Sequence, residues 1–227
     1  MSKKSLLEKE KYGFDDLCEI IDILRAPGGC PWDREQTHRS IRKSLIEETY
    51  EAVEGIDSDD NKIMCEELGD LLLQIVFHAA IARDENAFDM DDICTGICKK
   101  LIYRHPHVFS DVSAETSEEV LRNWDELKKK EKGQQTKSDV LQSVSRALPS
   151  LMRAQKLSKK SGEQTELSDI CDSIAKAAHK LKDETDDGVL GELLFNAARL
   201  GNLKKADLEQ VLYDENERFC QKFTKNY

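Results

Sequence analysis

The sequence predicts an all-α fold, and three observations support this expectation. Apolar residues recur every three or four positions through most of the 227 residues, which is the period of an amphipathic helix. Val, Ile and Thr never alternate with polar residues over the length of a strand, so almost no sheet is expected. Turn signals separate the periodic segments. The chain should therefore fold as helical bundles.

The first half of the chain contains five predicted helices. The first helix ends at the loop Pro27–Pro31, where two Pro and two Gly residues interrupt the pattern. The third helix is apolar on all sides from Leu68 to Phe77, which is the mark of a buried helix. The predicted helices cover residues 14–26, 38–56, 60–86, 89–104 and 117–132.

A polar segment at residues 133–146 predicts a linker, because it contains few apolar side chains. It would divide a first domain at residues 1–132 from a second helical domain at residues 147–227. The helices expected in the second domain cover residues 147–160, 168–183, 187–200 and 205–224.

The two halves share a short internal repeat. The segment Gly69–Leu73 recurs as Gly191–Phe195, with Glu192 in the place of Asp70. Other acidic positions of the first half are not kept, because Lys176–Lys180 and Val189 stand where acidic residues stand in the first copy. The second domain is therefore predicted to be a degenerate repeat of the first.

Composition excludes several classes of function. A net charge of −11 disfavours binding to a nucleic acid polymer, because no basic excess exists to replace its counterions. The seven cysteines are odd in number and form no Cys-x-x-Cys pair, which is typical of reduced thiols in the cytoplasm. The start of the chain is charged, and no run approaches the roughly 18 apolar residues of a membrane span. We therefore expect a cytoplasmic protein with no membrane partner.

Two acidic clusters lie on successive predicted helices. Glu47, Glu48 and Glu51 are spaced to share one helix face, and so are Glu67 and Asp70. Like charges at this spacing repel one another and destabilise the helix, whereas a cation bound between the carboxylates would make the arrangement favourable. The alternative interpretation is a solvated acidic face.

The residues around the two acidic clusters help to decide between a metal site and a solvated acidic face. On the first helix the stripe of Ile46, Tyr50 and Val53 points roughly opposite to the carboxylates, which favours a solvated acidic face. On the second helix Asp70 shares its stripe with apolar residues, and a carboxylate there is costly unless it is paired or binds a metal. Mg²⁺ suits a set of oxygen ligands that leaves positions for water and phosphate. No EF-hand loop is present for calcium, and no His joins the clusters for zinc.

Taken together, the motifs resemble those of the MazG nucleoside triphosphate pyrophosphohydrolases. Glu-Glu-x-x-Glu at 47–51 followed by Glu-x-x-Asp at 67–70 marks the wider all-α pyrophosphohydrolase superfamily, which includes dimeric dUTPases and phosphoribosyl-ATP pyrophosphohydrolases. The Arg-His-Pro-His-Val-Phe segment at 104–109 narrows the resemblance to MazG. The segments Gly29–Asp33, Lys100–Phe109 and Asn123–Trp124 complete the pattern.

The resemblance implies helical-bundle domains that assemble as homodimers or higher homo-oligomers. It implies magnesium-dependent hydrolysis of nucleoside triphosphates to the monophosphate and pyrophosphate. By motif position, the metal ligands would be Glu48, Glu51, Glu67 and Asp70, and Glu47 would orient or deprotonate the attacking water. Since the second half has lost these acids, residues 147–227 are expected to serve assembly or regulation.

Five further residues are candidates for substrate binding. Lys100 and Arg104 lie one helical turn apart and would clamp the triphosphate, although a solvated basic helix end has the same pattern. His105 follows them and would contact phosphate. Trp32 and Trp124 would stack on the base, although each could instead pin its segment to a core.

The sequence leaves more than one function open. The preferred function is a hydrolase of broad base specificity that clears aberrant or surplus nucleotides. A narrower dUTP or phosphoribosyl-ATP pyrophosphohydrolase is the alternative among enzymes. The eroded second half leaves open a non-catalytic module for nucleotide sensing or oligomerisation.

Overall fold

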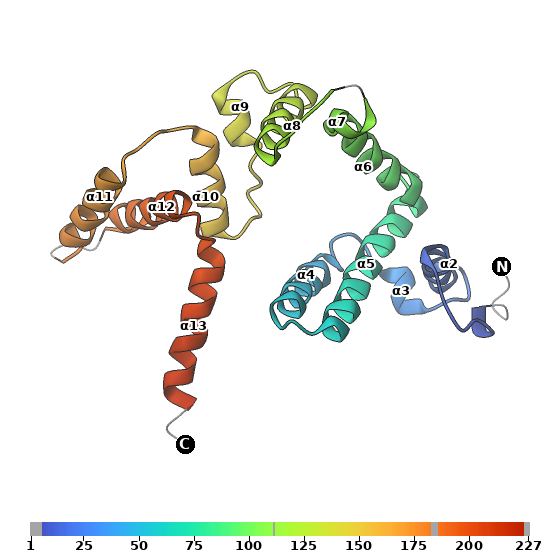
Figure 1. The fold of residues 1–227 in the computed structure, drawn as a ribbon. Coiled ribbons are helices and arrows are strands. Elements are labelled where there is room, and N and C mark those ends of the chain that lie inside the picture. Colours follow the sequence, from blue (N-terminus) through green and yellow to red (C-terminus); the bar gives the residue numbers. More distant parts are fainter. Residues whose placement is uncertain (1–5, 111, 183–185, 225–227) are drawn as a thin grey trace. The chain divides into compact units, whose positions relative to one another are not determined.

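A computed structural model describes residues 6–110, 112–182 and 186–224 (Figure 1). These residues form helices α2 to α13 and contain no strand, so the predicted all-α fold is confirmed. The chain divides into two compact units, residues 1–114 and 115–227. None of the described helices is both long enough and apolar enough to cross a membrane.

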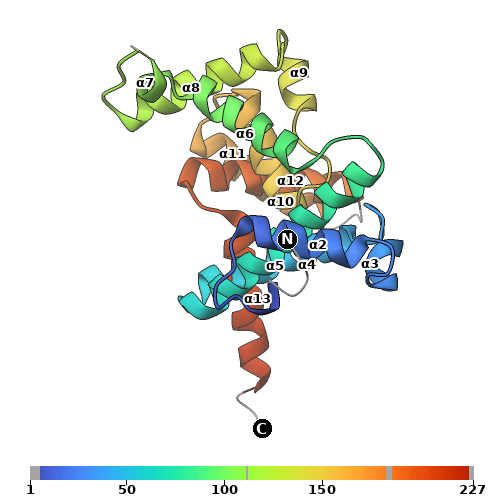
Figure 2. The same ribbon diagram turned by 90° about the vertical axis from the view of Figure 1, so that its right-hand side faces the viewer.

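The first unit is built around its longest helix. The α4 helix packs beside the N-terminal half of α5, and α2 packs against α5 from another side (Figures 1 and 2). The helices are α2 (Phe14–Arg25), α3 (Pro31–Glu35), α4 (Arg42–Asp57), α5 (Asn61–Asp84), α6 (Met90–Arg104) and α7 (Pro106–Phe109).

The core of the first unit gathers around the C-terminal half of α5. Its buried side chains are Ile21, Ile41, Val76, Phe77, Ala80 and Ile81. The N-terminal half of α5 is different, because Leu68 is 46% exposed and Leu71, Leu72 and Leu73 are only half-buried. The prediction of a buried helix from Leu68 to Phe77 is therefore wrong for its first part within one chain. Among the described residues of the first unit, no helix covers the exposed side of Leu68.

Polar contacts fasten α2 to the end of α5. The Arg25 guanidinium donates to the Asp84 carboxylate at 2.8 and 3.1 Å and to the Asp33 carbonyl at 2.6 Å, and it lies over the Phe77 ring. Arg83 pairs with Asp22 at 2.8 Å. These bonds fix α2 and α3 at the C-terminal end of α5.

The helix limits differ from the predictions at a few points. The predicted helix 38–56 begins only at Arg42, because Thr37 and Ser40 exchange hydrogen bonds that form a turn before it. The short helices α3 and α7 were not predicted, and each begins with a Pro whose fixed φ suits the first helical position.

The second unit contains the remaining helices. Its first helix, α8, spans residues that the sequence pattern assigned to the first domain, and α9 lies inside the segment predicted as a linker. The end of the predicted helix 168–183 lies outside the described residues. The helices are α8 (Ser117–Glu131), α9 (Lys137–Gln142), α10 (Ser150–Ser161), α11 (Leu167–Lys180), α12 (Asp187–Lys204) and α13 (Leu208–Thr224).

The helices of the two units follow a similar order. In the first unit α4 and α5 pair, and the earlier helix α2 packs on α5. In the second unit α11 and α12 pair, and the earlier helix α10 packs on α12. The descent of both units from one duplicated domain stays a prediction.

Candidate metal centre

The pair of α4 and α5 approaches closely at one glycine. A Cβ atom on Gly55 would lie 3.0 Å from the Cα of Met64, and the neighbouring Ala52 is buried. The connecting turn is short, with Asp59 in the left-handed region at φ 54° and the Asp60 side chain accepting from the Lys62 backbone N–H. Small side chains at the crossing therefore let the two acidic segments face each other across the helix pair.

Three carboxylates meet beside this crossing. Glu48 of α4 and Glu67 and Asp70 of α5 each offer one carboxylate oxygen, and these three oxygens lie within 4.8 Å of one another. All three side chains are half-buried. No other group of three or more His, Cys, Asp or Glu side chains with this spacing occurs among the described residues.

Glu51 belongs to the same group of charges. Its carboxyl is close enough to raise the pKa of Glu48, and its charge also raises the pKa of Glu67. Four of the five acids singled out in the sequence therefore interact in the structure: Glu48, Glu51, Glu67 and Asp70. We call these four residues the acidic cluster.

The electrostatics of the acidic cluster favour a cation. Partial burial raises the pKa of Glu48, and the charges of Asp70 and Glu51 raise it further. Partial burial followed by the charges of Glu51 and Asp70 likewise raises the pKa of Glu67. A divalent cation would remove this repulsion, and oxygen-only ligands match the preference of Mg²⁺. The residues present thus fit magnesium.

Glu47 interacts with a lysine and not with the acidic cluster. Its carboxylate is paired with the Lys43 ammonium at 2.7 Å, one turn earlier on α4, and its side chain is half-exposed. It is next in sequence to Glu48 but is not among the carboxylates that meet at α5.

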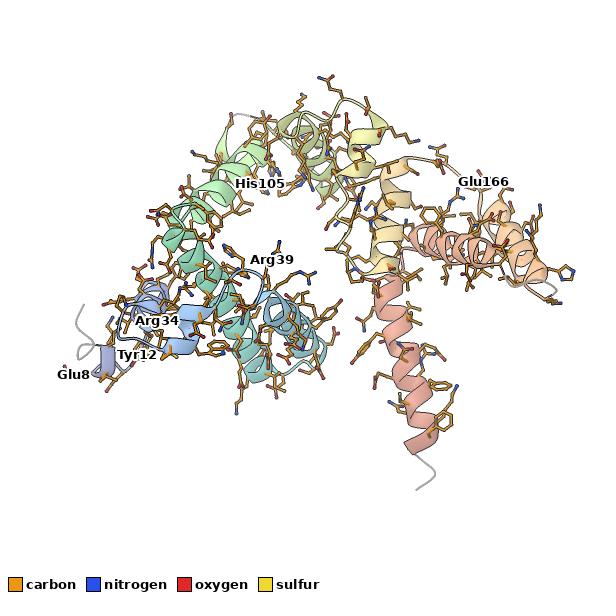
Figure 3. The ribbon with its side chains drawn as sticks, turned by 180° about the vertical axis from the view of Figure 1, so that it is seen from behind. Glu8, Tyr12, Arg34, Arg39, His105 and Glu166 are labelled. Atoms are coloured by element: carbon orange, nitrogen blue, oxygen red, sulfur yellow. The ribbon has the colours of Figure 1, made fainter. Side chains whose placement is uncertain are left out.

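The candidate phosphate-binding residues lie elsewhere in the same unit. Lys100 and Arg104 are on α6, which begins beyond the C-terminus of α5, and Asp84 at that terminus is about 21 Å along the helix from Asp70. Figure 3 shows His105 at the far end of α6, away from α4 and α5, and its Nδ1–H donates to the Leu101 carbonyl at 2.6 Å. One chain therefore does not bring these residues to the acidic cluster.

Of the two tryptophans, Trp32 shares a unit with the acidic cluster and lies away from it. Trp32 is 63% exposed on α3, which Arg25 ties to the C-terminal end of α5. Trp124 is half-buried on α8 in the second unit.

Two features of this region were missed from the sequence. The role of Gly55 could have been inferred, because a small residue one turn after Glu51 allows close helix packing. The contact between His38 and His78, whose Nδ1 atoms lie 2.8 Å apart, joins residues 40 positions apart and leaves no local signal.

Comparisons with known proteins identify the family. Residues 36–109, which include the acidic cluster, match the model of the MazG nucleotide pyrophosphohydrolase domain. The nucleoside triphosphate pyrophosphohydrolase of Escherichia coli K12 is 39% identical over 223 residues, covering 92% of this chain and 85% of that protein. The nucleoside triphosphate pyrophosphohydrolase/pyrophosphatase MazG of Thermotoga maritima is 36% identical, covering 93% of this chain and 84% of that protein.

Two further matches extend the comparison. The protein YabN of Bacillus subtilis is 38% identical over 94% of this chain, which spans about half of its length (46%). A crystal structure of a mazG-related protein from Thermotoga maritima matches 51% of this chain with 28% identity and a TM-score of 0.44. On the sequence relationships, the chain belongs to the MazG family of nucleoside triphosphate pyrophosphohydrolases.

Proposed function

We propose that this chain hydrolyses nucleoside triphosphates to the monophosphate and pyrophosphate, with magnesium, across a broad range of bases. Its role would be to clear aberrant or surplus nucleotides in the cytoplasm, where its seven free cysteines would stay reduced. The observation that carries the proposal is the meeting of Glu48, Glu67 and Asp70 within the segment that matches the family.

The acidic cluster would hold the metal. A bound Mg²⁺ would neutralise negative charge on the phosphates as the anhydride is broken. Glu47 is our candidate to orient and deprotonate the attacking water, for which it must leave Lys43. The water oxygen bonds to one phosphorus of the α–β anhydride, and the bond from that phosphorus to the bridging oxygen breaks. The bridging oxygen leaves with the bonding electron pair as part of the other product, and one proton of the water passes to Glu47.

Substrate binding would require a second copy of the chain. Lys100, Arg104 and His105 lie far from the acidic cluster of their own chain, so we propose that a partner chain supplies them to grip the triphosphate. We propose Trp32 and Trp124 as the side chains that stack on the base.

Exposed apolar side chains support a homodimer or higher homo-oligomer. Ile46, Tyr50 and Val53 form a stripe along α4 and are 42%, 57% and 44% exposed, and Leu68 on α5 is also exposed. Side chains of this kind usually pack against a partner rather than water when they form a continuous surface.

The test is pyrophosphate release from each common ribo- and deoxyribonucleoside triphosphate, with magnesium and with chelator. We expect magnesium-dependent release from several bases and a drop to background in Glu48→Ala and Asp70→Ala. Glu192→Ala is a matched control, because Glu192 stands in the second unit where Asp70 stands in the first, and it should retain full activity. Release in the chelator at the wild-type rate would contradict the proposal.

The same panel separates the alternatives. Pyrophosphate release from dUTP alone, or from phosphoribosyl-ATP alone, would show that the chain is the narrower enzyme and not one of broad base specificity. Nucleotide binding without release of pyrophosphate would instead support a non-catalytic sensing module.

A further inference from the structure

The second unit contains a basic cavity that is independent of the acidic cluster. Helices α10, α12 and α13 meet in this unit (Figure 1). A cavity of about 500 Å³ is lined by α10, the end of α12 and the segment before α13. Its lining residues are Met152, Gln155, Lys156, Lys159, Asn202, Lys205, Ala206 and Asp207. We call it the lysine cavity.

The charge of the lysine cavity is positive in a chain that is strongly negative. Lys156, Lys159 and Lys205 line it against one acid, Asp207, whereas the whole chain carries −11. None of the three ammonium groups has an ion pair or hydrogen bond within the part of the chain that the structure describes. One oxygen of the Asp207 carboxylate accepts from the Glu209 and Gln210 backbone N–H groups at the start of α13, and within the described residues Asp207 makes no ion pair with the three lysines. The lysines thus remain available to an anion.

The wall of the cavity is held in place by amide side chains. The Gln155 amide donates to the Ala206 carbonyl at 2.8 Å and accepts from the Leu208 N–H at 3.0 Å, and the Asn202 amide donates to the Gln155 carbonyl at 2.8 Å. A Cβ on Gly201 would lie only 2.7 Å from the Leu208 side chain, so the end of α12 and the start of α13 are in close contact here. The site is therefore formed before any ligand arrives, which reduces the entropy lost on binding.

Lys205 occupies a backbone conformation that disfavours it. It caps α12 in the left-handed region, at φ 56° and ψ 34°, where Gly is the usual residue. Its backbone N–H donates to the Asn202 carbonyl and the Ala206 N–H donates to the Gly201 carbonyl, so the backbone needs no lysine side chain to form this cap. The helix dipole can account for lysines in the last turn of α10, but it does not account for this one. Lys205 is exposed and lines the cavity, and a strained backbone conformation at such a position indicates a role for the side chain.

From these observations we propose that the lysine cavity binds a small phosphorylated anion, with Lys156, Lys159 and Lys205 contacting its phosphate oxygens. Three ammonium groups with no competing partner match a multiply charged phosphate group. The volume lies within the usual range of small-molecule sites and accommodates a pyrophosphate or a nucleotide. The second unit would in this way serve as a regulatory or product-sensing half. The proposal does not depend on catalysis by the first unit.

The test is calorimetric titration of the full chain with inorganic pyrophosphate and with inorganic phosphate, in chelator. The chelator removes the metal through which the acidic cluster would hold phosphate, so only metal-independent sites remain. We expect saturable binding of pyrophosphate that Lys159→Gln and Lys205→Gly each weaken at least tenfold. Lys204→Gln is the matched control. Lys204 is exposed, as the three cavity lysines are, but it does not line the cavity, so removing its charge should leave binding as in the wild type.

Lys205→Gly also separates binding from folding. Gly relieves the left-handed conformation, so this variant should melt at a higher temperature without ligand while it loses pyrophosphate. A lower melting temperature together with weaker binding would mean a structural role and would overturn the proposal. The proposal is equally overturned by no saturable binding at millimolar pyrophosphate, by equal weakening in Lys204→Gln, or by binding of RNA or heparin alone.

Discussion

The Nδ1 atoms of His38 and His78 lie 2.8 Å apart, and the two imidazole rings are stacked with an angle of 11° between their planes. His38 stands in the turn before α4, and His78 stands on α5 in the packed half of that helix. A hydrogen bond between two ring nitrogens needs one donor and one acceptor, so at least one ring must be neutral. The contact joins the turn before α4 to α5, and these two helices carry the acidic cluster.

Acidification should weaken this contact. Burial lowers the pKa of His78 below its usual range, and the charge of His38 lowers it further. The unfolded chain therefore binds the His78 proton more readily, with a pKa of about 6.5. Neutral His78 therefore contributes fully to the free energy of unfolding above a pH of about 6.5. This contribution is lost as the pH falls through the lower pKa that His78 has in the folded state.

The corresponding measurement compares melting curves between pH 7 and pH 5.5. We expect the wild type to lose more stability over this range than His78→Gln does. His179→Gln, which changes an exposed histidine of α11, should keep the wild-type dependence. Parallel pH curves for wild type and His78→Gln would contradict the prediction.

Magnesium should stabilise the first unit through the acidic cluster. At a magnesium concentration of about 100 Kd, linkage predicts about 2.7 kcal/mol, which corresponds to roughly 10 °C in Tm for a domain of this size. Glu67→Gln removes one of the repelling charges, so it should raise the Tm in chelator and shrink the magnesium shift. Calorimetry with and without magnesium checks both effects. An unchanged magnesium shift in the variant would place the ion elsewhere.

Gly55→Ala should disturb the metal centre without touching a carboxylate. The added Cβ would lie 3.0 Å from the Cα of Met64, so α4 and α5 must separate slightly. We expect magnesium affinity to fall by about tenfold, as for other groups that support metal ligands. Gly191→Ala is the control, since a Cβ there meets no atom within 4 Å. Titration of the magnesium-induced Tm shift gives the two affinities, and equal values would refute the argument.

Two arginines that join α2 to α5 should differ in their effect on stability. The Arg25 side chain is only 7% exposed and makes three short hydrogen bonds, so Arg25→Ala should cost about 2 to 3 kcal/mol. The Arg83–Asp22 pair is half-exposed, so Arg83→Ala should cost less than about 1 kcal/mol. Urea unfolding of both variants measures the difference. Equal losses would show that burial does not determine the strength of these bonds.

Mixing two inactive variants tests the shared site. Glu48→Ala would lack a metal ligand, and Lys100→Ala would lack a phosphate clamp. If each site takes its acids from one chain and its lysine from the other, mixed dimers regain one intact site, and random mixing restores about a quarter of the activity. Light scattering should give a mass of at least twice 25.9 kDa for the wild type. No recovery on mixing, from chains shown to exchange, would place both groups in one chain.

Local patterns predicted most of the helices. The period of apolar residues and the turn at Pro27–Pro31 are encoded within a few positions, and the limits of α2 and α5 agree with prediction within two residues. The start of α4 was placed too early, because a turn made by side chains at Thr37 and Ser40 carries no apolar signal.

Spacing along the chain predicted the acidic cluster but not its surroundings. Glu48 and Glu51 lie one turn apart, as do Glu67 and Asp70, so each pair was visible as a helix face. The exposure of Leu68 was not visible, because it depends on which surfaces the rest of the fold leaves open. The pairing of Glu47 with Lys43 has the spacing of one helical turn and could have been inferred from the sequence. The separation of Lys100 from the acids depends on the direction of α6, which no local pattern encodes.

The close approach of Gly55 and Met64 sets the distance between α4 and α5 beside the acidic cluster. Glu67 stands about 4.5 Å along α5 from Met64 and Asp70 about 9 Å, whereas Asp84 stands about 30 Å away. A change in the angle between the two helices about this contact would therefore displace Glu67 and Asp70 much less than Asp84. The metal ligands thus lie on the part of α5 whose position relative to α4 is least sensitive to such a change.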